Sequence, residues 1–184
     1  VRVFSEGKIY EQKYKRGDVI QPLTVIGDTD EHGTYVHFKP DGEIFETLIF
    51  SCSTLVNHLR ETAFLTKGLK INLKDLREDK DRDPDDVKKD VGKNFSFHYE
   101  GGIKEFVQYI NRTRTPLYPE IFYAEGSKDG VLVEVALQHN DEYNETIFSF
   151  VNNINTIDGG THLAGFKSGL TKTVNDYGRK FGLI

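Results

Sequence analysis

The sequence predicts an α+β fold, because short stretches of alternating polarity are mixed with segments of helical periodicity. Alternation is clearest at residues 131–138, where every second side chain from Val131 to Leu137 is aliphatic. Helical spacing is clearest near the C-terminus, where apolar residues recur every three or four positions: Leu163, Phe166, Leu170, Val174, Tyr177 and Phe181. This spacing predicts a final long helix with one buried face.

The composition indicates a globular chain, with 37% hydrophobic and 29% charged residues among 184, enough for one ordinary domain or two small ones. The formal net charge of −5 argues against a protein that coats nucleic acid through a generally basic surface, although a local basic patch is compatible with it. No apolar run approaches the roughly 20 residues that a membrane-spanning helix needs, so we expect a cytoplasmic protein. Because Met is absent and the chain opens at Val1, we expect an interior piece of a longer protein.

The first residues predict an antiparallel sheet built from hairpins. Turn signals at Glu6-Gly7 and Gly17-Asp18 divide residues 1–39 into short β-like runs. Residues 34–38 predict a further strand, which the Pro40-Asp41-Gly42 turn stops.

A helix and a charged segment follow this sheet. Ser53 is a good N-cap for a helix through about Leu65, and residues 69–73 predict a strand after Gly68. Residues 74–93 then hold eight acidic and seven basic side chains with few apolar ones. Because such a segment cannot bury a core, we expect a solvated loop or the tip of a β-hairpin.

The rest of the chain predicts a second α+β unit, with the boundary near Tyr99-Glu100. A strand at residues 95–99 precedes a helix that opens at Gly101-Gly102 and is ended by Thr115-Pro116. Three further strands precede the final helix, and we place them at residues 121–124, 131–138 and 145–151.

No complete catalytic motif is visible: there is no P-loop, no dinucleotide fingerprint and no Cys pair for zinc. The single cysteine, Cys52, is interpreted as a small buried hydrophobic residue. The histidines lack metal-ligand spacing, and we interpret each as structural or exposed: His32, His37, His58, His98, His139 and His162. On the residues alone, Gly33-Thr34 predicts a turn into a half-buried strand, whose Thr hydroxyl can both donate and accept a hydrogen bond.

Five motifs, in order along the chain, resemble the gyrase B family, the ATPase components of bacterial type II topoisomerases. They are Gly33-Thr34-x-Val36-x-Phe38, residues 59–65, residues 98–104, residues 133–138, and Asn152-Asn153-Ile154 followed by Gly159-Gly160-Thr161-His162. The resemblance implies that residues 1–99, with the charged insertion at about 74–93, are the C-terminal part of an ATPase domain. That domain would have the α/β sandwich of the gyrase, Hsp90, histidine kinase and MutL type. Residues 100–184 would begin a transducer domain, with an α+β fold like that of ribosomal protein S5.

The resemblance implies an ATP site around Thr34, because the family's Gly-Thr motif places the Thr hydroxyl at the adenine edge. Thr34 and Gly33 are therefore implied cofactor-binding residues, and Val36 would line the apolar floor of the pocket. Ser5 stands where some members hold an arginine at the pocket mouth, which would change how inhibitors stack there. The general-base glutamate and the Mg²⁺ ligands are implied to lie outside this chain, so we expect no catalytic or metal-binding residue in it and no hydrolysis by it alone.

The resemblance also implies a function in which ATP hydrolysis drives DNA strand passage and negative supercoiling. Lys167 follows Ala164-Gly165-Phe166, where some members hold a basic residue facing the DNA cavity; a solvated helix face is an equal alternative. Lys172 also reaches solvent on a helical wheel. Implied partners are DNA, the gyrase A protein, a second copy of gyrase B and ATP-site inhibitors such as aminocoumarins, with no membrane. Two alternatives stay open: the ATPase component of topoisomerase IV, which shares these motifs, and a non-catalytic interaction scaffold.

Overall fold

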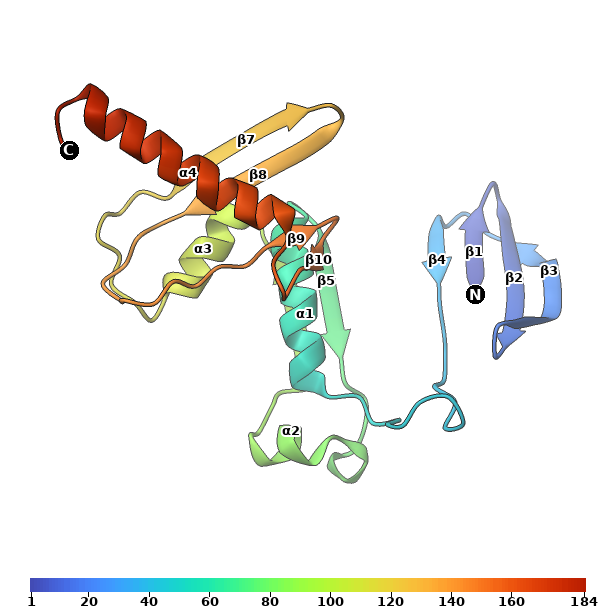
Figure 1. Ribbon diagram of the computed structural model, residues 1–184. Helices are drawn as coiled ribbons and strands as arrows, with labels where there is room; N and C mark the ends of the chain where they lie inside the picture. Colours follow the sequence, from blue (N-terminus) through green and yellow to red (C-terminus); the bar gives the residue numbers. More distant parts are fainter. The chain divides into compact units, whose positions relative to one another are not determined.

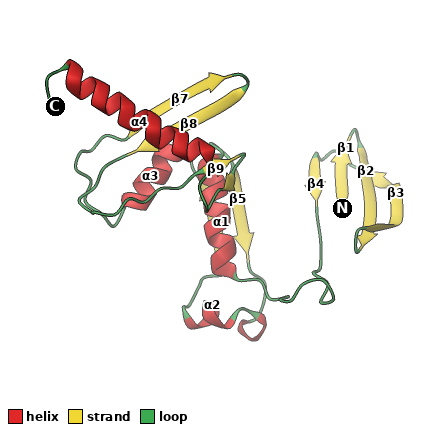
Figure 2. Ribbon diagram, viewed as in Figure 1, coloured by secondary structure: helices red, strands yellow, loops and turns green.

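The computed structural model describes residues 1–184, which form two compact units (Figure 1). The first unit comprises Val1–Ser51 and Arg77–Val87, and the second comprises Cys52–Leu76 and Lys88–Ile184. Helices and strands are mixed along the chain (Figure 2), so the predicted α+β class is confirmed. The boundary expected near Tyr99-Glu100 lies inside the second unit.

The first unit contains a four-stranded antiparallel sheet in the order β3-β2-β1-β4. Its strands are β1 (Arg2–Ser5), β2 (Lys8–Lys15), β3 (Asp18–Asp28) and β4 (Gly33–Tyr35). The hairpin turn predicted at Glu6-Gly7 is present, and the one predicted at Gly17-Asp18 lies one residue earlier, at Arg16-Gly17; both central residues of each turn have positive φ. The strand expected over residues 34–38 ends earlier, at Tyr35, which pairs with Arg2 of β1.

The expectation of a solvated loop at residues 74–93 is wrong in part. The segment does join two antiparallel strands, β5 (Lys70–Lys74) and β6 (Asn94–His98), but it contains a short 3-10 helix η1 (Asp79–Asp81) and a helix α2 (Pro84–Lys88). Asp83 accepts a hydrogen bond from the amide of Asp85 at 2.9 Å, as an N-cap does, and Pro84 suits the first helical position. Two charged side chains of this segment are buried, Arg82 and Asp86.

The core of the second unit lies between α1 (Cys52–Leu65), the β5–β6 pair and α3 (Ile103–Asn111). Helix α1 begins one residue before the predicted Ser53 and ends where expected. Its Phe64 is 1% exposed and stacks on Tyr99 at a centroid distance of 3.6 Å and on Phe106 of α3 at 4.9 Å. Cys52 is buried, as predicted, in a cluster with Val56, Ala63 and Phe97.

The C-terminal elements are two hairpins and a long helix. Strands β7 (Phe122–Lys128) and β8 (Val131–Leu137) pair through an Asp129-Gly130 turn, and β9 (Phe150–Val151) pairs with β10 (Ile154–Asn155). The strand expected over residues 145–151 is thus limited to its last two residues.

Helix α4 (Thr161–Lys180) is present, but most of its predicted buried face is exposed. Leu163 and Phe166 in its first turns are half-buried, whereas Val174 is 60% exposed. Tyr177 and Phe181 contact each other at a centroid distance of 4.4 Å. The periodicity therefore marked an apolar stripe correctly, but only its first turns are covered.

Candidate functional site

Thr34 lies on β4 directly opposite Val3 of β1. Because side chains alternate along a strand, Val3, Ser5 and Thr34 share one face of the sheet. Gly33 pairs with Phe4, so Ser5 and Gly33 lie near the same end of these strands. Thr34 is exposed, whereas Val3, Ser5 and Gly33 are half-buried. The sheet thus presents an accessible hydroxyl on Thr34 between apolar and small side chains.

Val36, unlike the other three predicted residues, lies outside the strands of the sheet. It lies just beyond the end of β4, two positions after Thr34, and its side chain is 62% exposed. Gly33 has a φ of +149°, a backbone conformation that favours glycine, and a Cβ added there would meet no atom within 4 Å. The backbone conformation, and not crowding, therefore explains the glycine.

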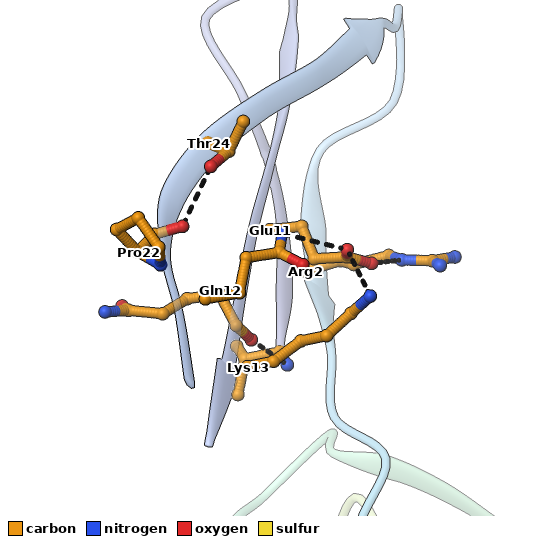
Figure 3. A network of polar contacts seen from close by, with 8 residues as sticks. Arg2, Glu11, Gln12, Lys13, Pro22 and Thr24 are labelled. Carbon is orange, nitrogen blue, oxygen red and sulfur yellow. Dashed lines mark hydrogen bonds and ion pairs between the residues drawn. The ribbon is translucent and has the colours of Figure 1, made fainter. Parts of the chain in front are cut away.

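The opposite face of the same sheet carries a polar network that fixes the strand register (Figure 3). Glu11 of β2 accepts hydrogen bonds from Arg2 of β1 at 2.7 Å and from Gln21 of β3 at 3.3 Å, and it pairs with Lys13 at 3.3 Å. The hydrogen bond from Arg2, followed by that from Lys13, lowers the pKa of Glu11 to about 2. Because this network ties β1, β2 and β3 together, it also holds Val3 in place on the Thr34 face.

An apolar cavity that sequence reasoning missed follows β4. Its volume is about 360 Å³, and none of the four predicted cofactor-binding residues lines it. Phe38 and Phe50 meet edge to face at a centroid distance of 6.1 Å, and the rim carries the Arg16–Asp41 ion pair. The hydrogen bond from Arg16 lowers the pKa of Asp41. The clustered apolar residues after Pro40 were the available signal, but their i, i+4 spacing (Ile44 with Leu48, Phe45 with Ile49) is typical of a helix, and this segment forms none.

The two lysines predicted for a DNA cavity both lie on α4. Lys167 forms an ion pair with Glu145, with 2.6 Å between Nζ and Oε1, so its charge has a partner inside the chain. Lys172 is exposed. These lysines belong to the second unit, whereas Thr34 belongs to the first.

The Gly-Gly-Thr-His block forms a tight start to α4. Gly160 has a φ of +152°, and a Cβ added there would lie 2.8 Å from the ring of His162. The His162 ring contacts the Thr156 hydroxyl at 3.2 Å, and that hydroxyl meets Ser149 at 2.6 Å. The block therefore connects α4 to the residues flanking the β9–β10 hairpin through a chain of hydroxyl contacts.

No group of three or more His, Cys, Asp or Glu side chains in residues 1–184 is arranged to hold a metal ion. None of the helices is long and apolar enough to cross a membrane.

Comparison with known proteins gives consistent matches. The family described as DNA gyrase B matches residues 102–184. The chain is 54% identical to the DNA gyrase B protein of Clostridium acetobutylicum and 50% identical to that of Halalkalibacterium halodurans, covering 100% of this chain and 27% of each relative. It is 49% identical to the DNA gyrase B protein of Bacillus mycoides, again over 100% of this chain but 43% of the relative. The chain thus spans about a quarter to less than half of these curated relatives.

Solved structures give the same result. The 43K ATPase domain of Thermus thermophilus gyrase B, in complex with an aminocoumarin, is 37% identical and superposes with a TM-score of 0.76. This match covers 100% of the present chain and 47% of the other. The gyrase B structure from Myxococcus xanthus, 23% identical with a TM-score of 0.70 over 91% of this chain and 46% of that one, shares the fold.

Proposed function

This chain belongs to the DNA gyrase B family, and from that premise we propose that it is a segment of the ATPase component of a DNA gyrase. The parent protein is part of a type II topoisomerase. In the proposed function it binds ATP and couples ATP hydrolysis to DNA strand passage and negative supercoiling. Its proposed partners are DNA, the gyrase A protein, a second copy of gyrase B, and aminocoumarin inhibitors.

The observation that carries the proposal is the Thr34 face of the first unit. An exposed hydroxyl next to Val3, Ser5 and Gly33 can hydrogen-bond to the edge of a purine whose ring packs on neighbouring apolar groups. The superposition on a solved gyrase B ATPase domain over the whole chain supports this assignment. The ligands of Mg²⁺ are proposed to lie in parts of the full-length protein outside this chain, as the resemblance to the gyrase B family implies.

The direct test is nucleotide binding by the full-length gyrase B protein with Thr34→Val. Removing one hydrogen bond to adenine should weaken the binding of a non-hydrolysable ATP analogue by about 1 kcal/mol, about five-fold, in calorimetric titration. Thr24→Val is the matched control, because the Thr24 hydroxyl donates locally to the Pro22 carbonyl at 2.9 Å on the same strand, β3. Equal affinities for the wild-type and Thr34→Val proteins would overturn the assignment.

Gyrase is favoured over topoisomerase IV because the curated relatives and the Thermus thermophilus structure cited above are named as gyrase. A supercoiling assay separates the two: the complex reconstituted with gyrase A should introduce negative supercoils into relaxed plasmid. A complex that only relaxes or decatenates DNA would support topoisomerase IV instead. The scaffold alternative predicts no ATP-dependent activity of the complex at all.

Lys167 and Lys172 are proposed to face the cavity for the transported DNA segment, with lower affinity for DNA expected when either is neutralised. Nζ of Lys167 is paired with the Glu145 carboxylate, so a DNA phosphate would have to compete with that carboxylate for the lysine.

A further inference from the structure

A cluster of polar groups lies on one face of the β7–β8 hairpin, in the second unit. Glu125 of β7 lies directly opposite Glu134 of β8, a pairing of like charges that destabilises a sheet. The Tyr123 hydroxyl lies 2.7 Å from a carboxylate oxygen of each glutamate. Because a phenol has a single proton to donate, it cannot satisfy both carboxylates, and the cluster favours a nearby cation.

Lys67 supplies that cation from a distant part of the chain. It lies just after the end of α1, and its Nζ is 3.3 Å from the Tyr123 hydroxyl and 3.4 Å from Oε1 of Glu134. The same Nζ lies 5.1 Å from the centroid of the Tyr123 ring, within the range of a cation–π contact. These contacts span 56 and 67 residues of sequence, so they tie the end of α1 to the hairpin.

Gly102, at the start of α3, makes room for the Lys67 stem. A Cβ added at Gly102 would lie 2.5 Å from Cε of Lys67 and 2.8 Å from its Cγ. Gly102 is buried and has a φ of +59°, so both the space and the backbone conformation favour glycine there. The absence of a side chain at Gly102 therefore leaves the space through which the Lys67 side chain passes.

The residues on either side of Lys67 are held by later parts of the chain. Asn153, in the turn between β9 and β10, donates from Nδ2 to the Thr66 hydroxyl at 3.1 Å. The amide of Gly68 donates to the carbonyl of Tyr99 at 3.1 Å. The end of α1 is thus contacted by the β7–β8 hairpin through Lys67 and by the β9–β10 hairpin through Thr66.

These polar contacts differ in kind from the packing around Phe64. The aromatic stack of Phe64, Tyr99 and Phe106 is apolar and closely packed, and it resists separation. The Lys67–Glu134 pair, in contrast, is long at 3.4 Å and its lysine side chain is 47% exposed, so it adds little to stability. A weak contact between two such segments can be broken and reformed without unfolding either one. Such a contact is therefore suited to transmitting a conformational change and contributes little to holding the fold together.

We propose that Lys67 is a positioning residue that links the end of α1 to the β7–β8 hairpin and passes nucleotide-dependent movement of the ATPase part to the transducer. This inference rests on the proposed function. It assigns to Lys67, Tyr123 and Glu134 the coupling of ATP turnover to DNA strand passage, and it gives them no role in binding ATP or in its hydrolysis.

The test uses the full-length gyrase B protein assembled with gyrase A, with Lys67→Met as the main variant. Methionine keeps an unbranched stem for the space beside Gly102 but removes the charge. The expected result is an ATPase kcat and KM within about two-fold of wild type, with several-fold fewer supercoils introduced per ATP hydrolysed. Lys70→Met, at an exposed lysine three residues further on, is the matched control and should leave the ratio unchanged.

Charge reversal separates coupling from a merely structural role. Lys67→Glu and Glu134→Lys should each lower the supercoiling-to-ATP ratio, and combining the two should restore most of it. Lys67→Arg, which keeps the positive charge, should retain most of the wild-type ratio. An unchanged ratio in Lys67→Met overturns the inference, as does a loss explained by a matching fall in thermal midpoint. If the wild-type complex neither hydrolyses ATP nor supercoils DNA, the proposed function itself fails, which is a distinct outcome.

Discussion

Among single residues, Glu11 shows how a side chain remote from Thr34 can govern the face that carries it. Glu11 is 8% exposed and bonded to three neighbours on the opposite side of the sheet: Arg2, Lys13 and Gln21. Loss of its charge would leave Arg2 without its partner and loosen the pairing of β1 with β2. Because Val3 belongs to β1, the surroundings of Thr34 would change without any substitution on their own face.

The depressed pKa of Glu11 makes this contribution depend on pH. Its folded pKa of about 2 lies below the ordinary value of 4.5, so the charged form stabilises the folded state above pH 4.5. That stabilisation is lost as the pH falls from about 4.5 to about 2. We therefore expect Glu11→Gln to lower the urea midpoint of the chain at pH 7 and the difference from wild type to shrink steadily below pH 4.5. A difference independent of pH would contradict this, and the exposed Glu46→Gln controls for loss of one charge.

Among the structural elements, the start of α4 is the clearest case of a sequence motif with a steric cause. Gly160 is required twice, because its φ of +152° disfavours other residues and because a Cβ would lie within 2.9 Å of two atoms of the His162 ring. The ring is in turn held by Thr156, next to the β9–β10 hairpin. A motif recognised by resemblance is thus explained locally by one backbone conformation and one ring.

We expect Gly160→Ala to destabilise the folded chain by about 1 kcal/mol or more, measured by chemical unfolding. Adding His162→Ala should recover only the steric part, since the strained φ remains, so the two substitutions should not be additive. Gly126→Ala is the control, because a Cβ there meets no atom within 4 Å. Full recovery in the double variant would mean that the backbone conformation contributes nothing.

For the molecule as a whole, what the sequence predicted well was local. The hairpin turns at Glu6-Gly7 and Gly17, and the course of α1, depend on nearby residues and were correctly expected. The shorter β4, the buried Asp86 in the charged segment and the exposed Val174 of α4 were missed, because each depends on what a residue meets in space. The functional residues differ in the same respect. Thr34 was predicted from the family resemblance, whereas the Lys67 contacts join residues too distant in sequence for any periodicity to reveal.

In the proposed function this chain contributes to ATP binding, and the carboxylate that activates water lies elsewhere in the full-length protein. A prediction for the chain alone follows from this. Asp28, the carboxylate at the Ser5 end of the face that carries Thr34, is paired with Lys8 at 2.5 Å, so it is a poor candidate to activate water. We therefore expect residues 1–184 alone to release no phosphate from ATP above the background rate, while the full-length protein does, in the same phosphate-release assay. Hydrolysis by the isolated chain that Thr34→Val abolishes would show instead that the catalytic carboxylate lies within this segment.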